Sequence, residues 1–67
     1  MMCGESIGQK LIKLRGERTQ SEVAQAVGVA DSAIGMYESD RRVPRDEIKV
    51  KLAEYFGVSI ESLFFSR

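Results

Sequence analysis

The chain has 67 residues, with ten lysines and arginines against ten aspartates and glutamates and no histidine. A chain of this length forms one small domain, so residues 1–67 are expected to fold as a single unit around a small core. The isoelectric point of about 6.2 argues against a nonspecific nucleic-acid binder, which is ordinarily basic. A specific binder is not excluded, because the distribution of charge matters more than its sum.

Several classes of protein are excluded by residues that the chain lacks. Without histidine there is no Ser/His/Asp set, and the sequence has no metal-ligand cluster and no phosphate-cradling glycine loop. We therefore expect no enzyme activity, no cofactor, no metal and no small-molecule ligand. Cys3 is the only cysteine and is expected to be an incidental thiol in a reduced compartment. Because no apolar run could span a bilayer and no signal-peptide pattern occurs, we expect a cytoplasmic protein without a membrane partner.

The first predicted helix follows Met1–Glu5, which carries no periodic signal. Ser6 and Gln9 have the spacing of a capping box, in which each side chain takes a backbone N–H of the other. The helix is expected to end near Gly16. Its apolar stripe consists of Ile7, Leu11 and Leu14. Basic residues crowd this helix and its exit: Lys10, Lys13, Arg15 and Arg18.

The stretch from Thr19 to Ser39 predicts two short helices joined by a glycine turn. Thr19 and Glu22 form a second capping box, and Gly28 suits the left-handed position that ends a helix. Val29 is expected to fold back onto the apolar stripe of the first of these helices, formed by Val23, Ala24 and Val27.

The second helix of this pair is predicted from about Asp31 to Ser39. Its apolar face is expected to consist of Ala30, Ile34 and Tyr37, and the opposite face of Asp31, Ser32, Gly35 and Met36. A protruding helix with small or polar outward residues fits the DNA major groove.

The next helix is predicted from Arg45 to Phe56, begun by Pro44 and ended by Gly57. Its apolar set is Ile48, Leu52, Ala53, Tyr55 and Phe56, with Val50 at the margin. A fifth helix is expected with Ser59 as its cap, and Leu63 is expected to close the core.

These features resemble the helix-turn-helix of lambda-repressor-like proteins, the Cro/cI (Xre-type) family of transcriptional regulators. The resemblance rests on Ala24, Gly28 and Ile34 at the family's small, turn and branched positions, and it extends over about residues 7–64. It implies an all-α fold of five helices with the motif at residues 19–39. It also implies double-stranded DNA as the partner and a pairing of Lys13 or Arg15 with Glu38.

The resemblance implies a homodimeric repressor or Cro-like switch protein on a palindromic operator. Gln20, Arg41 and Arg42 are expected to hold the DNA backbone, and Ser32 and Met36 to read bases. Asp31 suits the helix dipole or cytosine N4. The candidate DNA-binding residues are Gln20, Asp31, Ser32, Ala33, Gly35, Met36, Arg41 and Arg42, and the candidate dimer residues are Phe64 and Phe65.

A protein-interaction module that uses the same fold is the alternative reading. The neutral net charge and Asp31 favour such an antitoxin-like or repressor-associated domain, whereas the basic residues around the motif favour DNA. The two readings differ in salt dependence, because DNA binding weakens steeply as salt rises.

Overall fold

The computed structural model describes residues 6–65, with the backbone alone for Phe65. The expectations for Cys3 and for the Phe65 side chain lie outside the described part. Residues 6–65 form four α-helices and one π-helical turn, which confirms the all-α prediction of five helices. In chain order these are α1 (Ile7–Arg15), α2 (Gln20–Val27), α3 (Asp31–Glu38), α4 (Asp46–Phe56) and the turn η1 (Glu61–Phe65).

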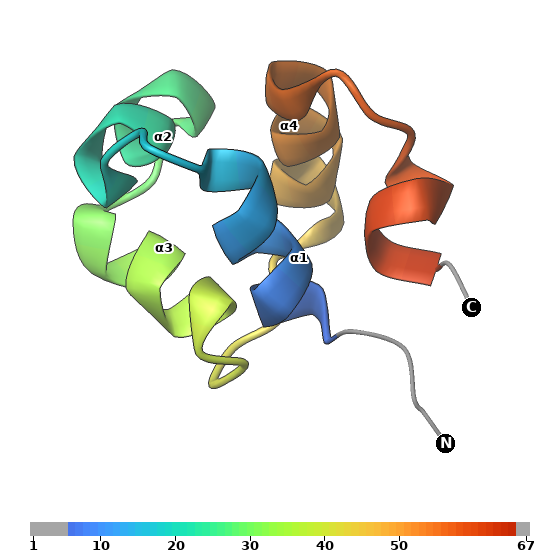
Figure 1. The fold of residues 1–67 in the computed structure, drawn as a ribbon, viewed down its shortest axis with the longest axis horizontal. Helices are drawn as coiled ribbons and strands as arrows, with labels where there is room; N and C mark the ends of the chain where they lie inside the picture. Colours follow the sequence, from blue (N-terminus) through green and yellow to red (C-terminus); the bar gives the residue numbers. More distant parts are fainter. Residues whose placement is uncertain (1–5, 66–67) are drawn as a thin grey trace.

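Helix α1 lies between two pairs of elements, with α2 and α3 on one side and α4 and η1 on the other (Figure 1). α1 packs against α3 and η1, while α2 packs against α3 and α4. The core therefore collects one apolar stripe from each element. Its buried members are Leu11, Val23, Ala24, Val27, Ile34, Tyr37, Leu52 and Leu63.

Both predicted capping boxes are present. The Gln9 N–H donates to the Ser6 hydroxyl over 3.1 Å, and the Ser6 N–H donates to the Gln9 side-chain oxygen over 3.0 Å. Thr19 and Glu22 make the same reciprocal pair, over 3.0 and 2.9 Å. These bonds satisfy donors that the first turns of α1 and α2 would otherwise leave unpaired, so both helices begin where the sequence predicted.

The glycine turn between α2 and α3 also forms as predicted. Gly28 has φ 80° and ψ 36°, in the left-handed region where a side chain would be strained. The N–H groups of Gly28 and Val29 both donate to the Ala24 carbonyl, over 2.8 and 2.9 Å. Val29 is partly buried against the core, so the turn both ends α2 and fixes the direction of α3.

The predicted apolar face of α3 is wrong at one position. Ile34 and Tyr37 are buried, but Ala30 is exposed because it lies at the N-cap, outside the helical turn. Ala33 instead is partly buried against the core. The buried side of α3 thus keeps Ile34 and Tyr37 as predicted, excludes Ala30 and includes Ala33 in part.

The last element is a π-helical turn rather than the expected α-helix. Its cap is as predicted, because the Ser62 N–H donates to the Ser59 hydroxyl over 2.9 Å. Leu63 is 2% exposed and closes the core, as expected. In α4, Leu52 and Ala53 are buried as predicted, whereas Val50 is 40% exposed.

A close approach between α1 and α3 was not predicted. A Cβ added to Gly8 would overlap the Glu38 carbonyl oxygen and lie 2.8 Å from the Tyr37 carbonyl oxygen. The backbone N–H of Gly8 donates to the Asp40 carboxylate over 2.9 Å. The absence of a side chain at Gly8 therefore lets the start of α1 pack directly on the end of α3.

Candidate nucleic-acid interface

The outward face of α3 carries small and flexible side chains. Asp31 and Ser32 are exposed, and Met36 is 41% exposed although it is a large apolar residue. The opposite face is held in the core by Ile34 and Tyr37. Since one side of α3 is fixed and the other is open, the helix can present Ser32 and Met36 to a groove without changing its packing.

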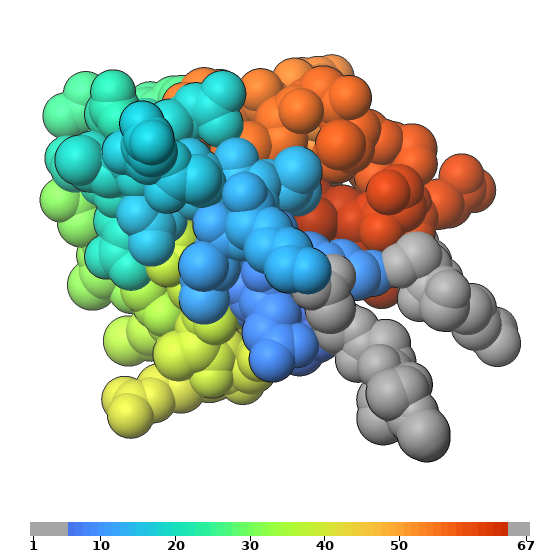
Figure 2. Space-filling model, viewed as in Figure 1, coloured from blue at the N-terminus to red at the C-terminus, as the bar shows by residue number. Residues whose placement is uncertain are grey.

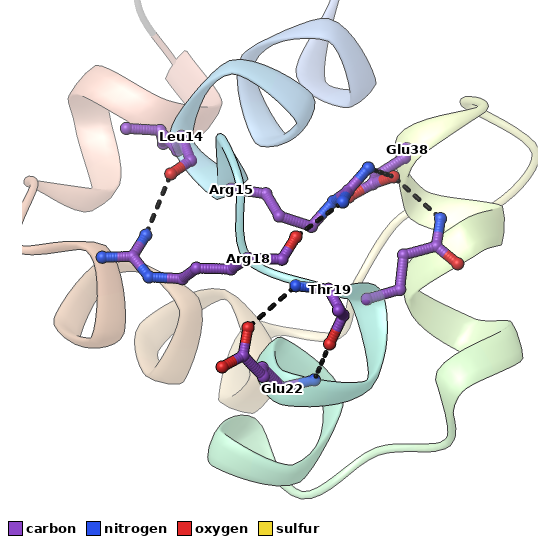
Figure 3. Close-up of polar contacts among 7 residues, drawn as sticks. Leu14, Arg15, Arg18, Thr19, Glu22 and Glu38 are labelled. Carbon is purple, nitrogen blue, oxygen red and sulfur yellow. Dashed lines mark hydrogen bonds and ion pairs between the residues drawn. The ribbon is translucent and has the colours of Figure 1, made fainter.

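A buried carboxylate joins three segments beneath this face. Glu38 is 8% exposed and accepts a hydrogen bond from Arg15 Nε over 2.6 Å and from Arg15 Nη2 over 3.3 Å. It also accepts one from Gln20 Nε2 over 3.0 Å. Figure 3 shows Arg15 between Glu38 and the backbone of Arg18, whose carbonyl takes Arg15 Nη1 over 2.8 Å. The expected pairing with Glu38 is therefore confirmed, with Arg15 as the partner.

The amide of Gln20 lies over the outward side of α3. A Cβ built on Gly35 would be 3.7 Å from both Nε2 and Oε1 of Gln20. Among the described residues the amide makes one hydrogen bond, to Glu38, and its Oε1 accepts none. An N–H and a carbonyl oxygen thus remain at the junction of α2 and α3. This shared position was not evident from the sequence, which placed Gln20 and Gly35 on separate helices.

The two arginines expected to hold phosphates lie on the connection after α3. Arg41 and Arg42 are both exposed. The part of the chain near residue 40, drawn in yellow, projects from one corner of the molecule (Figure 2). Asp40 adopts a positive φ of 63° and binds the Gly8 N–H, which fixes the base of this connection. The Arg41 N–H donates to the Met36 carbonyl over 2.9 Å.

Cations in α1 and on the connection after it make contacts within the domain. Lys10 Nζ donates to the Ser62 carbonyl over 3.3 Å, and Arg15 binds Glu38. Arg18 donates from Nη1 to the Leu14 carbonyl over 3.1 Å and lies against aromatic rings of α4. Lys10, Arg15 and Arg18 therefore make contacts within the domain, and Arg41 and Arg42 are the clearest candidates for phosphate binding.

Phe64, a candidate dimer residue, is partly buried against the core. The ammonium of Lys49 lies 5.5 Å from the centre of its ring. One of the two adjacent phenylalanines thus turns inward.

The sequence profile of the helix-turn-helix family matches residues 10–63, most of the chain. The chain belongs to this family. The expected lambda-repressor-like fold is confirmed by a solved structure, the P22 c2 repressor protein in complex with synthetic operator 9T in the presence of Tl⁺. The two share 21% sequence identity with a TM-score of 0.90 over 96% of this chain and 100% of that chain. No curated protein matches this sequence.

Residues 6–65 show neither a membrane-spanning helix nor a metal-binding cluster. None of the helices there is long and apolar enough to cross a membrane. In the same range no group of three or more His, Cys, Asp or Glu side chains is placed to hold a metal ion.

Proposed function

We propose that this helix-turn-helix protein is a homodimeric transcriptional repressor or Cro-like switch protein that binds a palindromic operator. As a member of its family, it is a sequence-specific DNA-binding regulator. The P22 c2 repressor, which shares its fold, was solved on a synthetic operator. The mechanism is steric: a dimer lies across a promoter with one recognition helix in each major groove, about one helical turn apart.

The observation that carries this proposal is the Gln20 amide held by Glu38 over Gly35. A polar group fixed at the first turn of α2 is placed beside backbone N–H groups that favour a phosphate. The same group borders the open face of α3. One rigid junction can therefore hold the DNA backbone while the neighbouring side chains reach base edges.

The side chains divide into two roles. Gln20, Arg41 and Arg42 bind phosphates and set the register of the domain on the duplex. Ser32 and Met36 read bases, Met36 by contact with a thymine methyl group. The remaining candidates lie around them: Asp31 at the start of α3, Gly35 beneath the Gln20 amide, and Ala33 on the side nearer the core.

The experiment that tests the function is selection from a random duplex pool with purified protein at two salt concentrations, followed by sequencing. We expect an enriched palindrome and an affinity that falls as salt rises. Absence of enrichment at both salts would contradict the proposal and favour the protein-interaction module. An enriched motif without two-fold symmetry would retain DNA binding but contradict the dimer.

The dimer is tested separately, on the complex with DNA. We propose that the end of the chain, with Phe64 and Phe65, forms the two-fold contact. Sedimentation of wild type and Phe65→Ser, each with the selected operator, should show two copies per duplex for wild type and weaker pairing for the variant. An unchanged stoichiometry and affinity in Phe65→Ser would remove that residue from the interface.

Base readout is tested at Met36. Met36→Ala should lower the preference for the selected operator over single-base variants by about 5- to 100-fold at the position it contacts, with little change in nonspecific affinity. Equal losses on all sequences would instead assign Met36 to backbone contact or to packing.

A further inference from the structure

Arg18 lies on the connection between α1 and α2, directly before the residues that begin α2. Its Nη1 donates to the Leu14 carbonyl over 3.1 Å. Its guanidinium carbon lies 5.3 Å from the ring centre of Tyr55 and 5.8 Å from that of Phe56. The two rings contact each other edge to face, with centres 5.1 Å apart. One side chain thus joins the end of α1 to the end of α4.

The backbone of Arg18 is fixed as well. Its N–H donates to the Arg15 carbonyl over 3.0 Å, and its carbonyl accepts from Arg15 Nη1 over 2.8 Å. Arg15 in turn binds Glu38, which holds Gln20. The residue that precedes the cap of α2 is therefore anchored on both sides, through its side chain to α4 and through its carbonyl to the Glu38 cluster.

The direction of the side chain separates Arg18 from the DNA-binding candidates. Figure 3 shows the Arg18 side chain running from the connection towards Leu14 and away from Glu38, the last residue of α3. A cation stacked on two rings and bonded to a carbonyl gives up these contacts if it turns to a phosphate. Its charge is thus committed within the domain, although the residue itself is exposed.

We propose that Arg18 is a positioning residue for DNA binding: it fixes the first turn of α2, and with it Gln20, by fastening the preceding connection to Tyr55 and Phe56. This inference rests on the proposed function. Fixing a group before binding removes the cost of ordering it in the complex, which is about 0.5–1.5 kcal/mol for a mobile side chain, or about 2- to 10-fold in affinity. Arg18 thus raises the affinity for DNA without touching it.

The test compares four variants on the selected operator across a salt series: Arg18→Gln, Arg18→Lys, Tyr55→Leu and, as matched control, Tyr55→Phe. We expect the first three to lower affinity by about 2- to 10-fold with an unchanged salt slope. Arg18→Lys should not restore the affinity, because lysine lacks the planar guanidinium that stacks on the rings. Tyr55→Phe should bind the operator as tightly as wild type, because the ring remains. The double variant Arg18→Gln/Tyr55→Leu should lose little more than either single change.

Two results would overturn the proposal. A salt slope reduced by about 0.9 per subunit in Arg18→Gln, with affinity kept in Arg18→Lys, would make Arg18 a phosphate contact. The second result is an affinity of Arg18→Gln for the operator equal to that of wild type. If urea titration shows that both proteins are fully folded under the binding conditions, this result would leave Arg18 with a role in stability alone.

A second readout needs no DNA. The Glu22 N–H, which donates to the Thr19 hydroxyl, should exchange with solvent about 2- to 5-fold faster in Arg18→Gln than in wild type. The N–H of Ser39, the residue that follows α3, should exchange as in wild type. If the Glu22 N–H exchanged at the same rate in Arg18→Gln and wild type, Arg18 would not fix the start of α2. If wild type bound no operator at all, the proposed function would fall, and this exchange rate would still decide whether Arg18 fixes the start of α2.

Discussion

Two glycines inside helices of this domain have opposite surroundings. A Cβ on Gly35 would meet the Gln20 amide at 3.7 Å, an ordinary van der Waals distance, whereas a Cβ on Gly8 would overlap the backbone of α3. Glycine in a helix costs about 1 kcal/mol relative to alanine, so a glycine with room above it is replaceable and one without room is not.

The first prediction uses this matched pair. Gly35→Ala should raise the free energy of unfolding by about 0.5–1 kcal/mol, because the methyl group fits beside Gln20 and the helix gains propensity. Gly8→Ala should lower it by about 1–3 kcal/mol or more, because rigid backbone occupies the space. Urea unfolding of both variants checks the pair. A stable Gly8→Ala would mean that α1 and α3 lie farther apart than described.

Some features of the candidate DNA-binding residues could be predicted from the sequence and others could not. Ser32, Met36, Arg41 and Arg42 are exposed as expected, because helical spacing and a turn place them outward irrespective of the partners of α3. The commitment of Arg18 to the rings of α4 could not be predicted, because it depends on which helix ends meet in space.

At the scale of elements, local sequence signals predicted where most helices begin and end. Capping boxes and left-handed glycines involve residues three to five apart, so the starts of α1 and α2 and the end of α4 follow from the sequence alone. The contact of Gly8 with α3 and the π-helical form of η1 come from packing between distant segments. No pattern within a single element contains that information.

The second prediction concerns the start of α3. Ala30 has the extended backbone of an N-cap but makes no side-chain bond to the helix, so a free N–H remains there. Ala30→Ser should raise the free energy of unfolding by about 0.5–2 kcal/mol, since serine can accept from the first turn. Thr19→Ala, which removes the matching cap of α2, should lower it by a similar amount in thermal or urea unfolding. No gain in Ala30→Ser would indicate that the first turn is already satisfied by solvent.

The third prediction concerns the link between α1 and α3. Arg15→Met should lower the free energy of unfolding by about 3 kcal/mol, because it leaves the carboxylate of Glu38 buried with Gln20 as its side-chain partner. Arg15→Met/Glu38→Leu should be less destabilising than Arg15→Met, because no buried charge remains. The comparison is made by urea unfolding at neutral pH. Glu38→Leu alone completes the cycle, and a double variant that loses the sum of the two single losses would show that Arg15 and Glu38 are not coupled, which would contradict the explanation by an unpaired buried charge.

At the scale of the whole molecule, the contacts of the cations explain how a DNA-binding domain can have zero net charge. Ten cations balance ten acids, and Lys10, Arg15 and Arg18 contact carbonyls, a carboxylate and aromatic rings. With no net charge, the domain has no general positive field, so under the proposed function a few exposed arginines would have to attract DNA. Its affinity should accordingly depend on salt less steeply than that of a basic domain with many phosphate contacts.

The fourth prediction tests this division of the cations. Arg42→Ala should weaken binding to all sequences alike and reduce the slope of log affinity against log salt by about 1.8 for a dimer, because each neutralised phosphate contributes about 0.9. Lys10→Ala is the matched control: its ammonium binds the Ser62 carbonyl, so its loss should leave the slope unchanged. Affinities of both variants for the selected operator and for an unrelated duplex, measured from low to physiological salt, provide the comparison. Equal slopes for Arg42→Ala and wild type would show that Arg42 does not contact a phosphate. A reduced slope for Lys10→Ala would show that α1 takes part in DNA binding.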